Sequence, residues 1–323
     1  MQNTLDGIAV QHPTRRRALA LAASGAAALS LFPAVVRAQT SSIRLGASSA
    51  ATQAEGYFAD QLGYFKQAGI TAALTVTGRG SETLAAVSRG DIDIASATPQ
   101  AVANAIIHEI PIKIIAVGGI YVEPPAVGLF VAKDSTVKAA RDIADGTVAV
   151  NSLGDSQTLG VWQWMANQRV DSSKVKIVEI PFSAIASAIK RKDVIAGCLV
   201  EPFMTADKDD VRIVPGVYGS LGYHWALGVW YARTEYIEKN AALVKQVVNA
   251  LHATAKYVNA NPAVVDPLLV TYTKLPLETV RAIAKPVWSE KTERSSVDPQ
   301  LQAAARFKVI SRVVSYEEAM FLA

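Results

Sequence analysis

The chain has 323 residues, of which 50% are hydrophobic and 19% charged, and its formal net charge is +4. Four of the 32 basic residues and one of the 28 acidic residues lie in the first 38 positions, so the remainder carries a net charge of about +1. A nucleic-acid-binding protein keeps a basic stripe in its folded part. None is visible after position 38, so we expect no nucleic-acid partner.

Residues 1–38 have the pattern of an export signal. A polar stretch ends in Thr14–Arg17, an apolar run covers Ala18–Phe32, and Val36–Ala38 suits cleavage after a small residue. These three features together are typical of a secretory signal. The Arg pair fits twin-arginine export, although Ala18 stands where a bulky apolar residue is usual, so the Sec route stays open.

The only cysteine, Cys198, is not at the cleavage site and no later apolar run reaches the roughly 20 residues of a membrane span. We therefore expect a soluble periplasmic protein without a lipid anchor.

After the signal, short apolar strands alternate with amphipathic helices. The first strands are expected at Ile43–Ala47, Ala72–Thr77, Ile92–Ala95 and Ile112–Val117, and the helices between them at Thr52–Gln67, Ser81–Arg89 and Pro99–Glu109. The rhythm then restarts, with strands at Val127–Val131, Thr147–Val150, Val175–Ile180 and Ile195–Val200 and helices at Ser156–Asn167 and Ala184–Arg191. Such alternation predicts an α/β fold with helices on both faces of each sheet.

The last third of the chain is expected to return to the first lobe. A strand is predicted at Trp225–Ala232, a long helix at Glu235–Val258, a break at Asn261-Pro262, and further helices at Pro276–Ala284 and Pro299–Ser311. Lobe one would then comprise residues 39–120 and 223–323, and lobe two residues 121–222. Two crossings between the lobes would form a hinge beside a cleft. A weak internal sequence similarity, in which Arg89–Ala95 resembles Arg191–Gly197, gives slight support to two related lobes.

The sequence contains no Gly-x-Ser-x-Gly elbow and no Walker loop. Beyond position 38 the histidines are His108, His224 and His252, and none has metal-ligand spacing to a partner. We therefore expect no enzyme, no metal and no cofactor.

Small polar residues follow the predicted strands in both halves of the chain. In open α/β sheets, ligands bind beyond the carboxyl ends of strands, where helix N-termini offer free N–H groups. The residues at these exits are Ser48, Ser49, Gly80, Ser81, Thr98, Gln100, Ser152, Asp155 and Ser156. Each of them, taken singly, also suits an ordinary helix cap. Because such residues recur at every strand exit, we give the ligand-binding interpretation the same weight as ordinary helix capping.

From Ile43 to about Val258, the chain resembles the solute-binding proteins of ABC importers for alkanesulfonates, taurine, nitrate and thiamine-pyrimidine precursors. Three motifs carry the resemblance: Gly63–Ile70, which is similar to the family's Gly-x-Phe-Lys-x-x-Gly turn, Arg89–Ile94, which resembles its Gly-x-x-Asp turn, and Glu201–Phe203, which resembles its acidic-Pro-aromatic motif. Their order and spacing favour this family but do not define a substrate.

The resemblance implies a type II periplasmic-binding-protein fold, in which two α/β lobes close on a ligand by hinge motion. It implies a small-molecule ligand, a membrane permease and an ATPase as partners, and a monomer. It also implies that Glu201 and the serines and threonine at the strand exits face the cleft. The aromatic candidates for the cleft wall, or alternatively for packing between the lobes, are Tyr121, Phe203 and Trp225.

The ligand itself stays open at this point. Arg79 is the only cation in the strand-exit loops, while Asp155 would repel an anion unless it caps its helix, and Glu201 adds a second carboxylate. An amino-pyrimidine or a zwitterion would suit these groups, whereas a sulfonate or aromatic acid would be held by helix N-termini alone. Two other functions remain as hypotheses. One is an enzyme on the same fold, of the pyrimidine-precursor synthase type, and the other is a receptor for a non-ABC transporter or a sensor.

Overall fold

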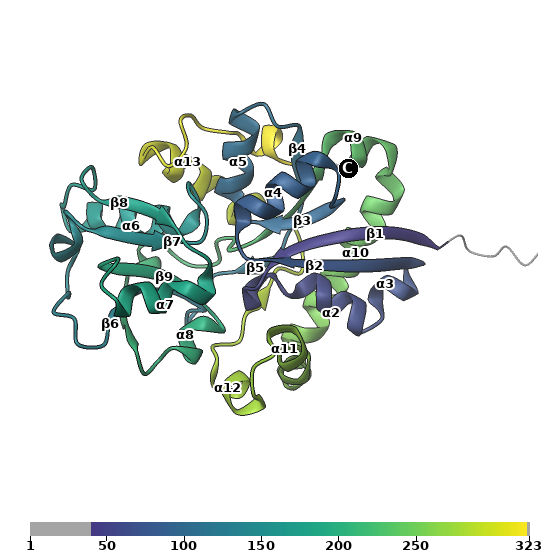
Figure 1. The fold of residues 1–323 in the computed structure, drawn as a ribbon. Coiled ribbons are helices and arrows are strands. Elements are labelled where there is room, and N and C mark those ends of the chain that lie inside the picture. Colours follow the sequence, from purple (N-terminus) through teal and green to yellow (C-terminus); the bar gives the residue numbers. More distant parts are fainter. Residues whose placement is uncertain (1–39, 322–323) are drawn as a thin grey trace, which may run out of the picture. The chain divides into compact units, whose positions relative to one another are not determined.

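The computed structural model describes residues 40–321, which contain two five-stranded sheets (Figure 1). The predicted export signal at residues 1–38 lies outside the described residues. The first sheet has the order β2-β1-β3-β11-β4, with β1 at Ser41–Ser48, β2 at Ile70–Thr77, β3 at Ile94–Ala97, β4 at Ile112–Val117 and β11 at Val229–Arg233. We call the part built on this sheet lobe one.

The second sheet repeats the plan of the first. Its order is β10-β6-β9-β7-β8, with β6 at Val127–Ala132, β7 at Thr147–Val150, β8 at Lys176–Glu179, β9 at Ala196–Val200 and β10 at Val211–Val214. In each sheet three strands are parallel, namely β2-β1-β3 and β8-β7-β9, and an antiparallel strand, β11 or β6, lies beside the third. We call the part built on this sheet lobe two.

The turns before β3 and β9 have a similar geometry in the two lobes. In the first turn the Arg89 side chain donates to Asp91, and the residue between them, Gly90, has a left-handed backbone conformation. In the second turn Arg191 donates to Asp193, and the residue between them, Lys192, is also left-handed. The sequence similarity between these segments therefore corresponds to one turn geometry that is used twice.

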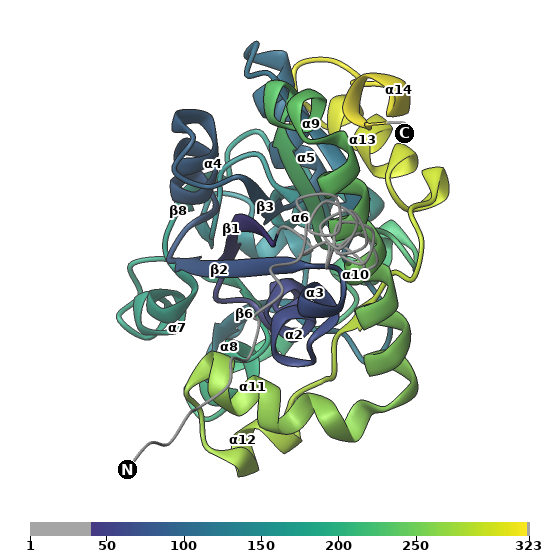
Figure 2. The ribbon, with the colours of Figure 1, turned by 90° about the vertical axis from the view of Figure 1, so that its right-hand side faces the viewer.

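Helices cover both faces of the first sheet (Figures 1 and 2). On one face lie α4 (Gly80–Arg89), α5 (Pro99–Ile107) and α13 (Asp298–Arg306), whose apolar residues join one buried cluster. On the other face lie α2 (Glu55–Gln61), α3 (Tyr64–Gln67) and α10 (Ala241–Ala260), which share a second cluster. Lobe two has its own core, to which α6 (Ser156–Asn167) and α7 (Phe182–Lys190) contribute. The hydrophobic effect therefore stabilises each sheet from its helical layers.

The remaining short elements complete the chain. They are α8 (Phe203–Ala206), α9 (Thr234–Lys239), α11 (Val265–Thr273), α12 (Leu277–Ala282), α14 (Tyr316–Ala319), β5 (Gly119–Ile120), β12 (Val287–Trp288), and the 3-10 turns η1 (Ala51–Gln53), η2 (Ala140–Ile143), η3 (Tyr218–Leu221), η4 (Pro262–Val264) and η5 (Arg294–Ser296). None of the helices among residues 40–321 is long and apolar enough to cross a membrane.

Two crossings connect the sheets, one between β4 and β6 and one between β10 and β11. They run side by side, because the Tyr121 N–H donates to the Trp225 carbonyl at 2.8 Å and the His224 N–H donates to the Tyr121 carbonyl at 2.9 Å. Strand β12 adds to the first crossing through its pairing with β5. The predicted two-lobed α/β fold with two crossings is thus confirmed, while the lobe limits at residues 120/121 and 222/223 stay a prediction.

Several predicted elements differ from the structure, among them the helix expected at Pro299–Ser311, which ends at Arg306. The single helix expected at Thr52–Gln67 is η1, α2 and α3, because Gly63 adopts φ 80°, which no continuing helix allows. The long helix expected at Glu235–Val258 is divided into α9 and α10 at Asn240. The strand expected from Trp225 begins only at Val229, since Trp225 belongs to the second crossing. The elements that were not predicted are strands β5, β10 and β12 and helices α8, α11 and α14.

Candidate functional site

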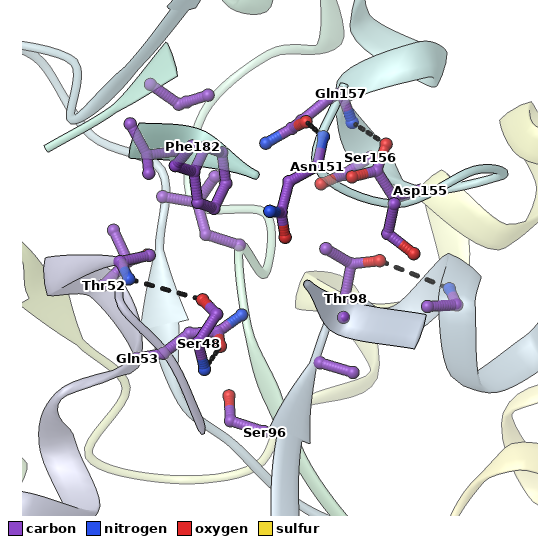
Figure 3. A pocket seen from close by; sticks show the side chains of 18 residues that line it. Ser48, Thr52, Gln53, Ser96, Thr98, Asn151, Asp155, Ser156, Gln157 and Phe182 are labelled. Atoms are coloured by element: carbon purple, nitrogen blue, oxygen red, sulfur yellow. Dashed lines mark hydrogen bonds between the residues drawn. The ribbon is translucent and has the colours of Figure 1, made fainter. Parts of the chain in front are cut away.

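A cavity lies where the strand ends of the two lobes meet (Figure 3). Its lining comprises Ser48, Ala50, Thr52, Gln53, Gly80, Ser96, Ala97, Thr98, Ala101 and Leu227 from lobe one and the second crossing, and Val127, Asn151, Ser152, Asp155, Ser156, Gln157, Phe182 and Val200 from lobe two. Parallel strands present their carboxyl ends at one edge of a sheet, which is why residues far apart in sequence meet here.

Two glutamines occupy equivalent places in the two lobes. Gln53 follows β1 and its side-chain oxygen accepts from the Ser48 N–H at 2.9 Å, and Gln157 follows β7 and accepts from the Asn151 N–H at 2.9 Å. A backbone N–H can bond only to the oxygen of the amide, so each bond defines which end is the NH₂ group. The NH₂ group of each glutamine is thereby left as a donor at the cavity wall, one from each lobe.

Two helices begin at the cavity. Thr98 caps α5 by accepting from the Ala101 N–H at 3.2 Å, and Asp155 caps α6 by accepting from the N–H groups of Gln157 and Thr158 at 2.9 and 3.2 Å. Asp155 is therefore a helix cap, one of the two roles that the sequence left open. Burial raises the pKa of Asp155 to about 7, against the lowering effect of its backbone hydrogen bonds.

The cavity combines a polar and an apolar side. In the view of Figure 3, Phe182 lies on the left and Thr98 and Asp155 on the right. Val127, Val200 and Leu227 extend the apolar part of the lining, and Phe182 is supported from behind by a stacked Phe203 with ring centroids 5.8 Å apart. Among residues 40–321, no Lys or Arg lines the cavity. The described wall can therefore bind a solute through hydrogen bonds and apolar contacts but not through a cationic side chain.

The cavity is small. The space open to the centres of water-sized molecules is ≈ 50 Å³, and one water needs roughly 10–15 Å³ by this measure. The lining therefore suits a solute of only a few heavy atoms, or one ring, in the arrangement described.

The structure brings six of the twelve residues proposed from the sequence into the cavity wall. These are Ser48, Gly80, Thr98, Ser152, Asp155 and Ser156. Ser49 and Ser81 lie outside the lining, and the Ser81 hydroxyl donates to the Glu179 carboxylate of lobe two. The side chain of Gln100 is fully buried, and its NH₂ group donates to the Gln300 side-chain oxygen at 2.6 Å. The Gln100 side chain therefore lies between α5 and α13.

Tyr121 and Trp225 also lie outside the cavity lining. Their rings stack with centroids 5.1 Å apart on the paired crossings. The geometry corresponds to the alternative that the sequence left open for them, packing at the junction between the lobes.

Glu201 is turned away from the cavity. Its carboxylate accepts from the Thr205 hydroxyl and N–H at 2.8 and 3.2 Å and from the Ala284 N–H at 3.2 Å. It thereby ties the end of β9 to α8 and to the segment after α12, and burial raises its pKa.

Sequence reasoning missed several lining residues. Gln53 lies inside the predicted helix Thr52–Gln67, so it carried no signal of its own. Ser96 directly follows the predicted strand Ile92–Ala95 and could have been recognised as a strand-exit residue, although in the structure it lies within β3. Asn151 and Gln157 belong to the predicted strand-exit loop, and their polar character after an apolar strand could have identified them. Phe182 is apolar, and only its position at the start of α7 brings it to the cavity.

Across residues 40–321, no group of three or more His, Cys, Asp or Glu side chains is arranged to hold a metal ion. The lone Cys198 is fully buried and accepts a hydrogen bond from the Tyr218 hydroxyl at 2.9 Å.

The fold resembles several solved structures at low sequence identity. The ligand-binding component of an ABC-type import system from Staphylococcus aureus, with zinc bound, is 11% identical at a TM-score of 0.76, over 87% of this chain and 96% of that one. The alkanesulfonate-binding protein SsuA from Xanthomonas axonopodis pv. citri, bound to MOPS, is 16% identical at 0.73, over 88% and 99%. The periplasmic nitrate-binding protein NrtA from Synechocystis PCC 6803 is 14% identical at 0.70, over 87% and 84%.

These similarities define the fold as that of a periplasmic binding protein. The profile of the NMT1/THI5-like family matches residues 51–264, which is more than half of the 323-residue chain. The chain belongs to the NMT1/THI5-like family. No curated protein matches it by sequence.

Proposed function

We propose that this protein is the extracytoplasmic receptor of an ABC importer and that it captures a small organic solute by closing its two lobes. The observation that carries this proposal is the cavity, because both lobes supply hydrogen-bonding groups to one enclosed space. The two crossings offer the hinge on which such closure would occur. The export pattern of residues 1–38 supports delivery to the periplasm, and a permease and an ATPase would be its partners.

The chemistry of the wall favours an uncharged or zwitterionic solute. The NH₂ groups of Gln53 and Gln157 offer donors, Asp155 offers a carboxyl group, and Phe182 offers a flat apolar surface. A pyrimidine-like ring that carries both donors and acceptors matches all of these groups. A sulfonate or an aromatic acid would depend on amide groups and on the N-termini of α5 and α6 for its negative charge.

An enzyme on the same fold is the alternative from another class. Acid–base chemistry usually needs two titratable groups in reach of a substrate, whereas Asp155 is the only titratable side chain in the lining. Binding without turnover is therefore the better-supported proposal. Detection of a product from any panel compound would reverse this preference.

The test is a ligand screen by thermal unfolding of residues 39–323. The panel contains taurine, alkanesulfonates, nitrate, aromatic acids and amino-pyrimidines. A compound present at about 100 times its Kd stabilises the native protein by about 2.7 kcal/mol, which is a clear shift in Tm. A shift with one class would support the receptor and identify its chemistry. If the protein shows no shift both as purified and after unfolding and refolding, the proposal fails for these classes.

A variant pair tests the location of the site. Ser152→Ala with Ser156→Ala removes two hydroxyls of the cavity wall, so we expect weaker binding and little change in the Tm of the unliganded protein. Ser88→Ala is the matched control, because its hydroxyl bonds only to the Leu84 carbonyl of its own helix. Unchanged affinity in the double variant would place the site elsewhere.

A further inference from the structure

Several hydrogen bonds join the lobes next to the cavity, at the ends of β2 and β8. The Asn151 side-chain NH₂ group donates to the Gly78 carbonyl at 2.9 Å, and the Ser81 hydroxyl donates to the Glu179 Oε1 at 2.5 Å. In lobe one, Gly78 lies in the turn between β2 and α4 and Ser81 lies in the first turn of α4. In lobe two, Asn151 directly follows β7 and Glu179 is the last residue of β8. These bonds therefore connect two separately built cores.

The approach of the lobes at this point depends on a glycine. A Cβ atom at Gly80 would come within 3.3 Å of the Ser152 Cβ, which is closer than most such contacts. Without a side chain, the turn between β2 and α4 can lie directly on the loop after β7. The turn is thus shaped to meet lobe two, and Glu179 is the charged group placed opposite it.

Glu179 uses both carboxylate oxygens and contacts groups from both lobes. Its Oε1 accepts from Ser81 and lies 4.0 Å from the Arg79 Nε, and its Oε2 accepts from the Leu153 N–H at 3.4 Å. The Arg79 pair is long and half-exposed, so it contributes little. The hydrogen bond from the Ser81 hydroxyl to the Glu179 carboxylate, at 2.5 Å, is the stronger contact.

We propose that Glu179 is a positioning residue that holds the two lobes together over the cavity without touching the ligand, by accepting the Ser81 hydroxyl across the interface. This inference rests on the proposed function. It adds a residue role to that function, because a side chain that stabilises the closed arrangement increases the fraction of molecules that can hold a bound solute. Glu179 is absent from the cavity lining, so its effect is separable from direct ligand contact.

The test is a distance measurement between the lobes in residues 39–323, with no ligand added. Nitroxide labels are placed at Ser88→Cys on α4 and Ser187→Cys on α7, both exposed positions, while the native Cys198 is fully buried and takes no label. In pulsed electron paramagnetic resonance, Glu179→Ala should add a longer distance component and lower the ratio of closed to open molecules roughly tenfold.

Two further variants make the result specific. Ser81→Ala should reproduce the effect of Glu179→Ala, and the double variant should be no more open than either single one, since both remove one bond. Asp193→Ala is the control, because this lobe-two carboxylate pairs only with Arg191 of its own lobe. Distance distributions that match the parent in both single variants would overturn the proposal. Because the distance measurement needs no ligand, its result can be interpreted even if the ligand screen fails.

Discussion

At the scale of single residues, the most unusual environment is that of Glu55. Its side chain is fully buried in α2, where the Trp230 indole N–H donates to one oxygen at 2.7 Å. Burial raises the pKa of Glu55 to about 8, and the hydrogen bond from Trp230 lowers it only in part. The carboxyl group is thus neutral in the folded protein at pH 7, and its ionisation would place an uncompensated charge in the core.

This environment predicts a stability that falls with rising pH. Glu55 releases its proton near pH 4.3 in the unfolded chain but near pH 8 in the folded one. Its contribution is therefore fully present below the lower value and is lost as pH rises through the upper one. The difference in unfolding free energy between Glu55→Gln and the parent should shift in favour of the variant as the pH is raised from 5 to 9. We expect this shift to be at least about 1.4 kcal/mol. Urea unfolding at both pH values measures this.

The control for Glu55 is Glu238→Gln, an exposed carboxylate on α9 that should follow the parent at both pH values. If the difference between Glu55→Gln and the parent does not change with pH, the carboxyl group is not titrating in this window.

Glu201 carries a second prediction at the residue scale. Glu201→Ala leaves the Thr205 hydroxyl and the Ala284 N–H without their acceptor, which should cost about 1–3 kcal/mol. We expect a lower Tm and an unchanged affinity for any panel compound that binds. Glu201→Gln keeps an acceptor oxygen and should lose less. A loss of affinity at an unchanged Tm would instead support the sequence-based prediction that Glu201 contacts the ligand.

At the scale of elements, α6 depends on its N-cap residue, Asp155, which directly precedes the helix. Asp155 accepts from two N–H groups that have no partner inside the helix. Because Asn caps helices about as well as Asp, Asp155→Asn should retain most of the stability, whereas Asp155→Ala should lose about 1 kcal/mol. Urea unfolding at pH 7 without ligand compares the two. Equal losses in both variants would show that the charge and not the cap matters.

The elements that could be predicted have strong local signals. Thr98-Pro99 marks the start of α5 because threonine accepts from the third residue and proline needs no donor at the first helical position. The break at Gly63 was not recognised, because a glycine within an amphipathic pattern also fits a continuous helix. Strand β10 covers only Val211–Val214, with Arg212 as its one polar residue, and four residues are too few to show a strand periodicity.

At the scale of the whole molecule, the first crossing should tolerate no added volume. A Cβ atom at Gly119 would lie 2.6 Å from the Thr52 carbonyl oxygen, which is backbone and cannot move aside. Gly119→Ala should therefore cost about 1–3 kcal/mol. Gly228→Ala, in the second crossing, is the matched control, because its Cβ atom would come no closer than 3.4 Å to a neighbour. Thermal unfolding measures both, and equal Tm values would contradict the packing argument.

By itself, the sequence determined the α/β alternation and indicated the family, and it predicted the strand exits as the region of the candidate site. The alternation and the strand exits depend on hydrophobic periodicity and on local capping, which nearby residues encode. The family was indicated by the resemblance of three short motifs, at Gly63–Ile70, Arg89–Ile94 and Glu201–Phe203. Only the tertiary structure decided which exit residues meet. Ser48, Thr98 and Ser156 reach one cavity, whereas Glu201 stands at an equivalent exit and turns to Thr205. Side-chain direction at a strand end depends on the partners that packing brings there, and for Glu201 one of those partners is 83 residues away.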